Sequence, residues 1–205
     1  MINKIKLLNF PPFKEVEVNF KPITILAGFN DTGKSRLLYA CEPLEAEGFI
    51  KEGSTIYVND NLVRVEDEWE DPFLDLITET ILLCPEESID LSSVKEKIIL
   101  LENPEQGLHP SLQSKLCKDI AEAYAEGKQI IIETHSDHII NGIRVAVAQK
   151  RIKGSDVQTN FFAKKGEKHV EIVMNDKGRY RLYPKGFMTQ WDDDLDALCL
   201  NLIIK

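Results

Sequence analysis

Three stretches of the chain are apolar and β-branched almost throughout, and amphipathic segments lie between them. They are residues 23–28 (ITILAG), 97–102 (KIILLE) and 128–133 (KQIIIE). Such continuous runs are typical of strands that are buried on both faces of a parallel sheet. Between the last two runs, Leu112, Leu116, Ile120 and Ala123 recur at helical spacing, with Pro110 at the start and Gly127 at the end. The pattern predicts an α/β fold with helices covering the sheet.

Shorter elements are predicted at both ends of the chain and after the first apolar run. IKLLNF and VEVNF, on either side of Pro11-Pro12, indicate an N-terminal antiparallel hairpin. Helices are expected over residues 34–48, 71–84 and 134–149, and a second hairpin over 54–66 turns at Asn59-Asp60-Asn61. From Val157 onward short strands alternate with turns, and a last helix is expected from about Asp192 to Ile203. We therefore expect a core domain over residues 1–150 and a small β/α appendage over residues 151–205.

Composition narrows the class of protein. The chain has 205 residues, of which 43% are hydrophobic, and a net charge of −9. An acidic surface repels nucleic-acid backbones, so any DNA contact needs a partner or a local basic patch such as Lys164, Lys165 and Lys168, a cluster that is more typical of a solvated loop. Four scattered cysteines without a C-x-x-C pair argue against a zinc site or a disulfide framework, and we expect them to be reduced and mostly buried. No stretch is long and apolar enough for a membrane span, so we expect a cytoplasmic protein without membrane contact.

The most specific motif is a phosphate-binding loop between the first apolar run and the helix that follows. Residues 28–35, GFNDTGKS, match G-x-x-x-x-G-K-[ST] in the required strand-to-helix context. Glycines allow backbone N–H groups to surround phosphates, the lysine reaches the β- and γ-phosphates, and the serine hydroxyl binds Mg²⁺. The predicted nucleotide-binding residues are Gly28, Asn30, Asp31, Thr32, Gly33, Lys34, Ser35 and Arg36.

An acid at the end of a second apolar strand should complete this site. Glu102 ends the run IILL, and we expect its strand to lie beside the phosphate-loop strand so that Glu102 orients Mg²⁺ together with Ser35.

Two further motifs follow Glu102 in the order that one family of ATPases requires. The segment 103–110 is NPEQGLHP, and Thr134-His135-Ser136 follows the third apolar run. With these motifs the chain resembles ABC-type ATPases of the RecF and SMC-like group, most of all the OLD-type and defence-system branch. The resemblance implies a three-layer α/β/α P-loop NTPase that uses ATP and Mg²⁺, with His135 contacting the γ-phosphate. Residues 183–187, YPKGF, resemble the tail of a C-terminal domain of unknown function in one subfamily.

The same resemblance fails in the middle of the chain. Residues 36–97 contain no glutamine for a Q-loop and no Leu-Ser-Gly-Gly-like signature, so we interpret this region as reduced relative to the family. Leu91-Ser92-Ser93 is a weak match, and an N-cap for a short helix at residues 94–96 explains it better. A homodimer of the usual kind would then lack its trans contact to the γ-phosphate. A heteromeric partner that supplies the signature, slow hydrolysis, or nucleotide binding without turnover are the alternatives.

Asn103 occupies the position at which related ATPases carry the glutamate that activates water. An amide cannot accept a proton at neutral pH. If the segment is extended, Glu105 points the same way as Asn103, and Glu133 ends the neighbouring strand, so either acid is a candidate water activator.

Two classes of function follow. One is an ATPase that couples hydrolysis to a DNA-processing or defence partner, and the other is a nucleotide-sensing pseudo-ATPase. A nuclease is disfavoured, because no Asp-x-Asp pattern of that kind follows Asp137 and the run Asp192-Asp193-Asp194 is more typical of helix capping.

Overall fold

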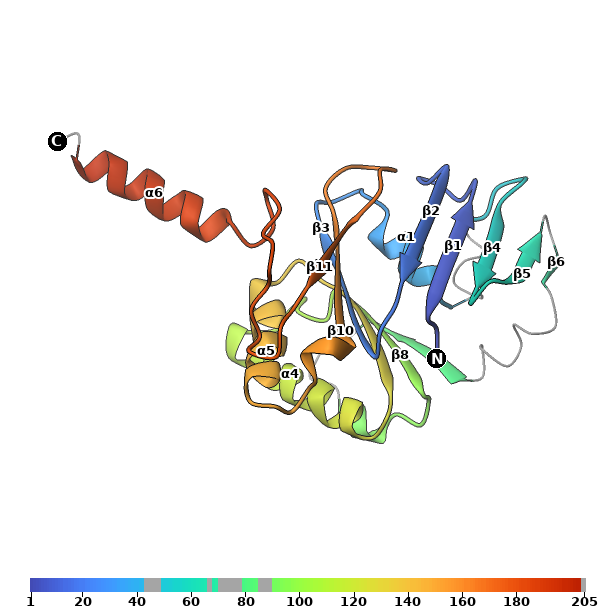
Figure 1. Cartoon of the computed structure of the whole chain (residues 1–205), viewed down its shortest axis with the longest axis horizontal. Helices are drawn as coiled ribbons and strands as arrows, with labels where there is room; N and C mark the ends of the chain where they lie inside the picture. The colour runs from blue at the N-terminus through green and yellow to red at the C-terminus, as the bar shows by residue number, and fades with distance from the viewer. Residues whose placement is uncertain (43–48, 66–67, 70–78, 85–89, 204–205) are drawn as a thin grey trace.

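The computed structural model describes residues 1–42, 49–65, 68–69, 79–84 and 90–203. Within them, the chain forms two sheets and a set of helices arranged in layers (Figure 1). The predicted α/β class is confirmed.

The central sheet has the strand order β11-β10-β3-β9-β8-β7 among the described residues. All neighbouring pairs are parallel except β10 and β11, which form an antiparallel hairpin. The three continuous apolar runs form β3 (Ile23–Gly28), β8 (Ile98–Glu102) and β9 (Gln129–Glu133). The outer strands are β7 (Thr80–Leu83), β10 (Val157–Phe162) and β11 (Val170–Val173). The mainly parallel sheet that the sequence predicts is thus confirmed.

One face of this sheet is covered by α4 (Pro110–Ala125) and α5 (Asp137–Ala148). His109 caps α4 by accepting the Ser111 N–H, and the Ser136 hydroxyl accepts the N–H groups of His138 and Ile139 at the start of α5. The predicted α4 face is buried except for Leu112, which is 42% exposed, while Cys117 and Ala121 are buried in addition. Ile23, Ile25, Ile130 and Ile132 and their neighbours contribute the apolar sheet side of this core.

The opposite face is covered by α1 (Lys34–Tyr39) and by a second, antiparallel sheet. This sheet has the order β2-β1-β4-β5-β6 among the described residues. It joins the predicted N-terminal hairpin, β1 (Lys4–Leu8) and β2 (Glu15–Asn19), to the predicted second hairpin, β4 (Thr55–Val58) and β5 (Asn61–Val65), and to β6 (Glu68–Trp69). The third layer is therefore mostly β-sheet, because the alternating strands bury one row of side chains against the central sheet (Figure 1).

Three predicted helices differ in the structure. The helix over 34–48 ends at Tyr39, and hydrogen-bonded turns follow up to Glu42, because the next residue in sequence is Pro43 and a residue before proline is disfavoured in the α conformation. Within 71–84, residues 80–83 form strand β7, and residues 71–78 lie outside the described part of the chain. The short helix near Val94 is instead a 3₁₀ turn, η3 (Leu91–Ser93), whose cap is Asp90.

The C-terminal segment continues the central sheet before it leaves the body. A 3₁₀ turn, η4 (Gly154–Asp156), leads into β10, which pairs with β3 along its whole length. After β11, the turn at Asn175–Gly178 leads to a single bridge between Met174 and Tyr180. The predicted last helix is present as α6 (Gln190–Ile203), and it projects from the molecule (Figure 1).

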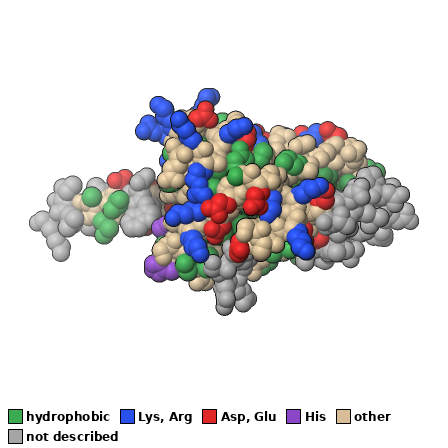
Figure 2. Space-filling view, turned by 90° about the horizontal axis from the view of Figure 1, so that it is seen from below, with side chains coloured by type: hydrophobic (Ala, Val, Ile, Leu, Met, Phe, Trp, Pro, Cys, Tyr) green, Lys and Arg blue, Asp and Glu red, His purple; other side chains and the backbone are tan. Residues whose placement is uncertain are grey.

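Surface charges are mixed rather than sorted by sign. On the face shown in Figure 2, lysine and arginine side chains are interspersed with carboxylates, and α6 carries exposed apolar and acidic side chains. Leu195 and Leu198 on this helix are 48% and 62% exposed.

Two of the four cysteines, Cys41 and Cys117, are buried as expected, whereas Cys84 and Cys199 are exposed. Among the described helices, none is long and apolar enough to cross a bilayer.

Candidate functional site

The phosphate-loop motif lies at the carboxyl end of β3, where the sequence places it. Gly28 has a φ of +137°, and a Cβ atom there would lie 2.1 Å from the carbonyl oxygen of Phe162 on β10. The Phe29 N–H donates to the same oxygen at 3.1 Å. Glycine at this position is therefore required by the close approach of the neighbouring strand. Gly33, with a φ of +106°, ends the loop at the start of α1.

Lys34 is folded back onto the loop. Its Nζ donates to the Phe29 carbonyl oxygen at 2.7 Å, and the Thr32 hydroxyl donates to the same oxygen at 2.8 Å. Burial lowers the pKa of Lys34, while the nearby carboxylates of Glu133 and Asp31 act in the opposite direction. An ammonium that is bonded to a backbone carbonyl at the phosphate loop can exchange that bond for an anion's oxygen.

Ser35 contacts Glu133, which the sequence suggested as a water activator and not as a partner of Ser35. Its hydroxyl donates to Oε1 of Glu133 at 2.8 Å. Glu133 is 2% exposed, and its Oε2 atom is buried without a hydrogen-bond partner. Burial raises the pKa of Glu133 to about 7, although the Ser35 hydrogen bond and the Lys34 charge lower it. One oxygen of this buried acid therefore has its hydrogen-bonding capacity unused.

Glu102 stands one strand further from the phosphate loop than predicted. The expectation that its strand lies beside β3 is wrong, because β9 is inserted between β3 and β8. Glu102 and Glu133 are direct partners in the β8/β9 register, so the two carboxylates leave the sheet side by side. Glu102 accepts hydrogen bonds from the Tyr39 hydroxyl at 2.6 Å and from the Cys84 thiol at 3.1 Å. Burial and this bond to Glu102 raise the pKa of Tyr39.

Asn103 begins a turn instead of continuing the strand. Its φ is +42°, its N–H donates to the Glu133 carbonyl at 2.9 Å, and its own carbonyl accepts from Gln106 at 2.9 Å. The Oδ1 atom of Asn103 is buried and has no hydrogen-bond partner. Two oxygens with unmet hydrogen-bonding capacity, one from Asn103 and one from Glu133, therefore belong to residues that line the same cavity.

The Glu105 carboxylate does not point the same way as Asn103, as it would in an extended segment. Because residues 103–107 turn, both of its oxygens reach the loop after β9 instead. Oε2 accepts from the Thr134 hydroxyl and Oε1 from the His135 N–H, each at 2.7 Å. The geometric argument that placed Glu105 beside Asn103 is thus wrong, and Glu105 anchors the loop that carries His135.

We expect Glu105→Gln to lower the free energy of unfolding by about 1–2 kcal/mol, because an amide replaces one acceptor oxygen by a donor and removes the charge that strengthens both bonds. Chemical denaturation of the two proteins measures the difference. Glu122→Gln is the matched control, since Glu122 pairs with Arg151 at the surface and its loss should change little. Equal stability of Glu105→Gln and the unchanged protein would show that Glu105 does not hold this loop.

His135 is exposed at the edge of the site. Its ring makes no hydrogen bond within the described residues, and it lines the same cavity as Lys34. Partial burial and the Lys34 charge lower its pKa, while Glu105 acts in the opposite direction. A neutral imidazole at this place can donate or accept a hydrogen bond at the cavity wall.

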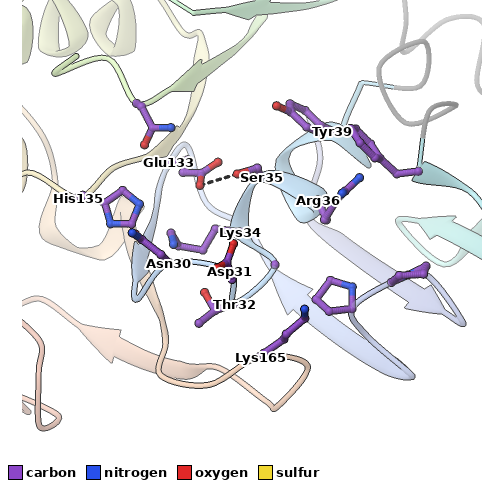
Figure 3. A pocket seen from close by; sticks show the side chains of 15 residues that line it. Asn30, Asp31, Thr32, Lys34, Ser35, Arg36, Tyr39, Glu133, His135 and Lys165 are labelled. Carbon is purple, nitrogen blue, oxygen red and sulfur yellow. Dashed lines mark hydrogen bonds between the residues drawn. The ribbon is translucent and has the colours of Figure 1, made fainter. Parts of the chain in front are cut away.

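These residues surround a cavity of about 610 Å³ above the phosphate loop (Figure 3). A second wall was not predicted: the Arg36 guanidinium lies 3.4 Å from the centre of the Phe49 ring, which stacks on Tyr39. Pro11, Pro12 and Lys165 complete the lining. The sequence marks Lys165 only as part of a basic cluster, and no motif marks Phe49.

Comparison with known proteins agrees with the site. A family model described as "AAA ATPase domain" matches residues 1–84 and 80–140. The chain belongs to this ATPase family. A second model, described as a protein of unknown function (DUF3696), matches residues 152–198, as the tail motif predicts for the C-terminal segment of this ATPase. No curated protein matches the sequence.

Solved structures show that this ATPase shares the fold of ATP-binding cassettes. A nucleotide-free ATP-binding cassette from an ABC transporter is 12% identical, with 86% of this chain and 93% of that chain covered and a TM-score of 0.56. The cassette cbiO1 from Clostridium perfringens is 14% identical, with 83% and 88% covered and a TM-score of 0.55. The dimeric cassette MJ0796 with ADP and Pi is 14% identical, with 82% and 98% covered and a TM-score of 0.53. At these identities the likeness concerns the fold, and it confirms the predicted ABC-type P-loop ATPase architecture.

Proposed function

We propose that this P-loop ATPase binds ATP with Mg²⁺ in the cavity above residues 28–35 and hydrolyses it slowly unless a partner completes the site. The observation that carries the proposal is the contact between Ser35 and the buried Glu133 directly beside Lys34. A hydroxyl, a carboxylate and an ammonium then converge where the motif places the β- and γ-phosphates.

The donor set of the cavity fits Mg²⁺. Mg²⁺ prefers oxygen ligands, and in nucleotide sites it keeps several waters and phosphate oxygens besides one or two protein ligands. Ser35 Oγ and the unpaired Oε2 of Glu133 supply such oxygens, and Glu102 stands beside Glu133 in register. Among the described residues, no group of three or more His, Cys, Asp and Glu side chains could hold a metal ion. When bound, Mg²⁺ neutralises charge on the β- and γ-phosphates.

The chain's own groups perform the remaining tasks. Lys34 exchanges its bond to the Phe29 carbonyl for phosphate oxygens, and His135 reaches the γ-phosphate from the loop that Glu105 holds. We assign the ordering of the attacking water to Glu133 Oε2 and Asn103 Oδ1, since both are buried, unpaired and part of the cavity lining. Phosphoryl transfer depends mainly on positioning and charge neutralisation, so the amide at position 103 does not by itself prevent it.

A nucleotide-sensing pseudo-ATPase is the second candidate. Two observations favour it: Asn103 stands where a general base is expected, and Glu105 is engaged with Thr134 and His135 and so cannot replace it. Under either reading we propose that the ATP-bound state docks a second copy or another protein that supplies a signature segment, as part of a RecF/OLD-like DNA-processing or defence system. Dimeric cassettes of this fold, such as MJ0796, support pairing of this kind.

Single-turnover hydrolysis of ATP by the purified full chain tests the proposal. We expect slow hydrolysis in the presence of Mg²⁺, and we expect Asn103→Glu to accelerate it by up to about a hundredfold, because a carboxylate can act as a general base where an amide cannot. Asn103→Asp places a shorter carboxylate at the same position and controls for charge alone. Tight ATP binding without turnover in either protein would contradict the enzyme and support the pseudo-ATPase.

A further inference from the structure

The loop between β10 and β11 reaches the nucleotide cavity from the segment that matches a family of unknown function. Phe162 at the end of β10 is the register partner of Gly28, so residues 163–168 leave the sheet beside the phosphate loop. A Cβ atom at Gly166 would lie 2.7 Å from the Pro12 carbonyl oxygen, which shows how closely this loop packs on Pro11-Pro12. The loop is thereby held at the rim of the cavity.

Lys165 is the residue of this loop that lines the cavity, together with Lys34 and Ser35. Figure 3 shows Lys165 at the edge of the cavity, on the same side of Lys34 as Thr32. Its neighbour Lys164 is paired with Glu167 at 3.3 Å, whereas Lys165 makes no hydrogen bond or ion pair within the described residues. An ammonium group without a counter-charge beside a phosphate-binding loop favours an anionic ligand.

The position of Lys165 also indicates which part of a nucleotide it would contact. Glu133 and His135 lie on the far side of Lys34 from Lys165 (Figure 3), and they mark the end of the cavity assigned to the γ-phosphate. Lys165 lies at the other end, beside Pro12, which packs on Gly33 where the loop meets α1. With the γ-phosphate assigned to the Glu133 and His135 end, the α-phosphate and ribose, which ATP and ADP share, would fall at the Lys165 end.

On the basis of the proposed nucleotide site, we propose that Lys165 binds the α-phosphate end of the nucleotide, and that the C-terminal segment thereby forms part of the nucleotide site. A second contact links the same two parts of the chain: a Cβ atom at Gly186 would lie 2.4 Å from the Phe29 ring of the phosphate loop. The C-terminal segment thus touches the loop at Phe29 and lines the cavity at Lys165, and α6 begins four residues after Gly186.

Isothermal titration of the full chain with ATP and, separately, with ADP tests the inference. We expect Lys165→Ala to weaken both ligands by the same factor, about three- to tenfold, and to reduce the dependence of binding on salt, because an exposed charge is screened by ions. Lys164→Ala removes the same charge one residue away from the cavity and should leave both affinities unchanged. Circular dichroism of each variant verifies the fold.

The outcomes separate the inference from the proposed function. If the unchanged protein binds ATP and ADP and Lys165→Ala binds them as tightly as Lys164→Ala does, the role of Lys165 is wrong and the nucleotide site stands. Weakening of ATP alone would overturn the α-phosphate assignment, since only the γ-phosphate distinguishes the two ligands. If the unchanged protein binds neither nucleotide, the proposed function itself fails.

Discussion

Lys34→Ala is expected to weaken ATP binding by about a hundredfold. Lys34 is buried beside the phosphate loop and donates a hydrogen bond that a phosphate oxygen can take over. Loss of one charged partner from a desolvated pair costs about 2–5 kcal/mol, and about 3 kcal/mol corresponds to roughly a hundredfold in the dissociation constant. Titration with ATP in the presence of Mg²⁺ measures the change.

The stability of the unliganded protein should respond differently to the same substitution. Burial disfavours the charged form of Lys34 and lowers its pKa, whereas its bond to Phe29 and the nearby Glu133 carboxylate favour the charged form, so alanine should change the unfolding temperature little. Lys97→Ala is the matched control, because Lys97 precedes β8 at the opposite end of the strand from Glu102 and pairs with Glu79. Nucleotide affinity that is unaffected by Lys34→Ala would place the ligand elsewhere in the molecule.

Glu133→Gln is expected to reduce Mg²⁺-dependent hydrolysis by about a hundredfold or more while ATP binding without metal is retained. Glutamine preserves the shape and an oxygen for the Ser35 hydroxyl, but it removes the negative charge that would face the metal and the attacking water. Loss of a positioned catalytic acid or base typically costs about 10²–10⁴ in rate. In the absence of Mg²⁺, affinity for ATP should be equal or higher, since a carboxylate near the phosphates is neutralised.

Glu102→Gln separates the two neighbouring acids. Glu102 is bonded to Tyr39 and Cys84 rather than to Ser35, so its loss should impair metal-dependent binding less than the loss of Glu133 does. Parallel measurements of rate and of the Mg²⁺ concentration needed for half-maximal binding compare the two variants. The reverse order of effects would restore Glu102 as the principal metal-orienting acid, as the strand-end motif alone suggests.

Much of this architecture is encoded locally. The phosphate loop is predictable because its glycines, lysine and serine must occupy fixed places between a strand and a helix. Strands β3, β8 and β9 are recognisable in the sequence because a strand that is buried on both faces needs apolar side chains at nearly every position. The helix predicted over residues 71–84 is wrong at Thr80–Leu83, which form a strand. A short apolar run fits a buried strand as well as a helix, so the sequence does not distinguish the two.

The arrangement of acids in the site depends on pairing between distant strands. Nothing within IILLEN indicates that β9 lies between β8 and β3, yet this insertion brings Glu133, and not Glu102, against Ser35. The turn that begins at Asn103 likewise redirects Glu105 to Thr134 and His135, a contact across 29 and 30 residues of sequence.

The sequence by itself therefore determined that this protein is a P-loop ATPase, because the chemistry of the phosphate loop is carried by adjacent residues. Only the tertiary structure decided which carboxylate meets Ser35, what Glu105 holds, and that Lys165 stands at the cavity. Those contacts arise from strand order and from loops that meet at one edge of a parallel sheet, and neither is written in the spacing of residues along the chain.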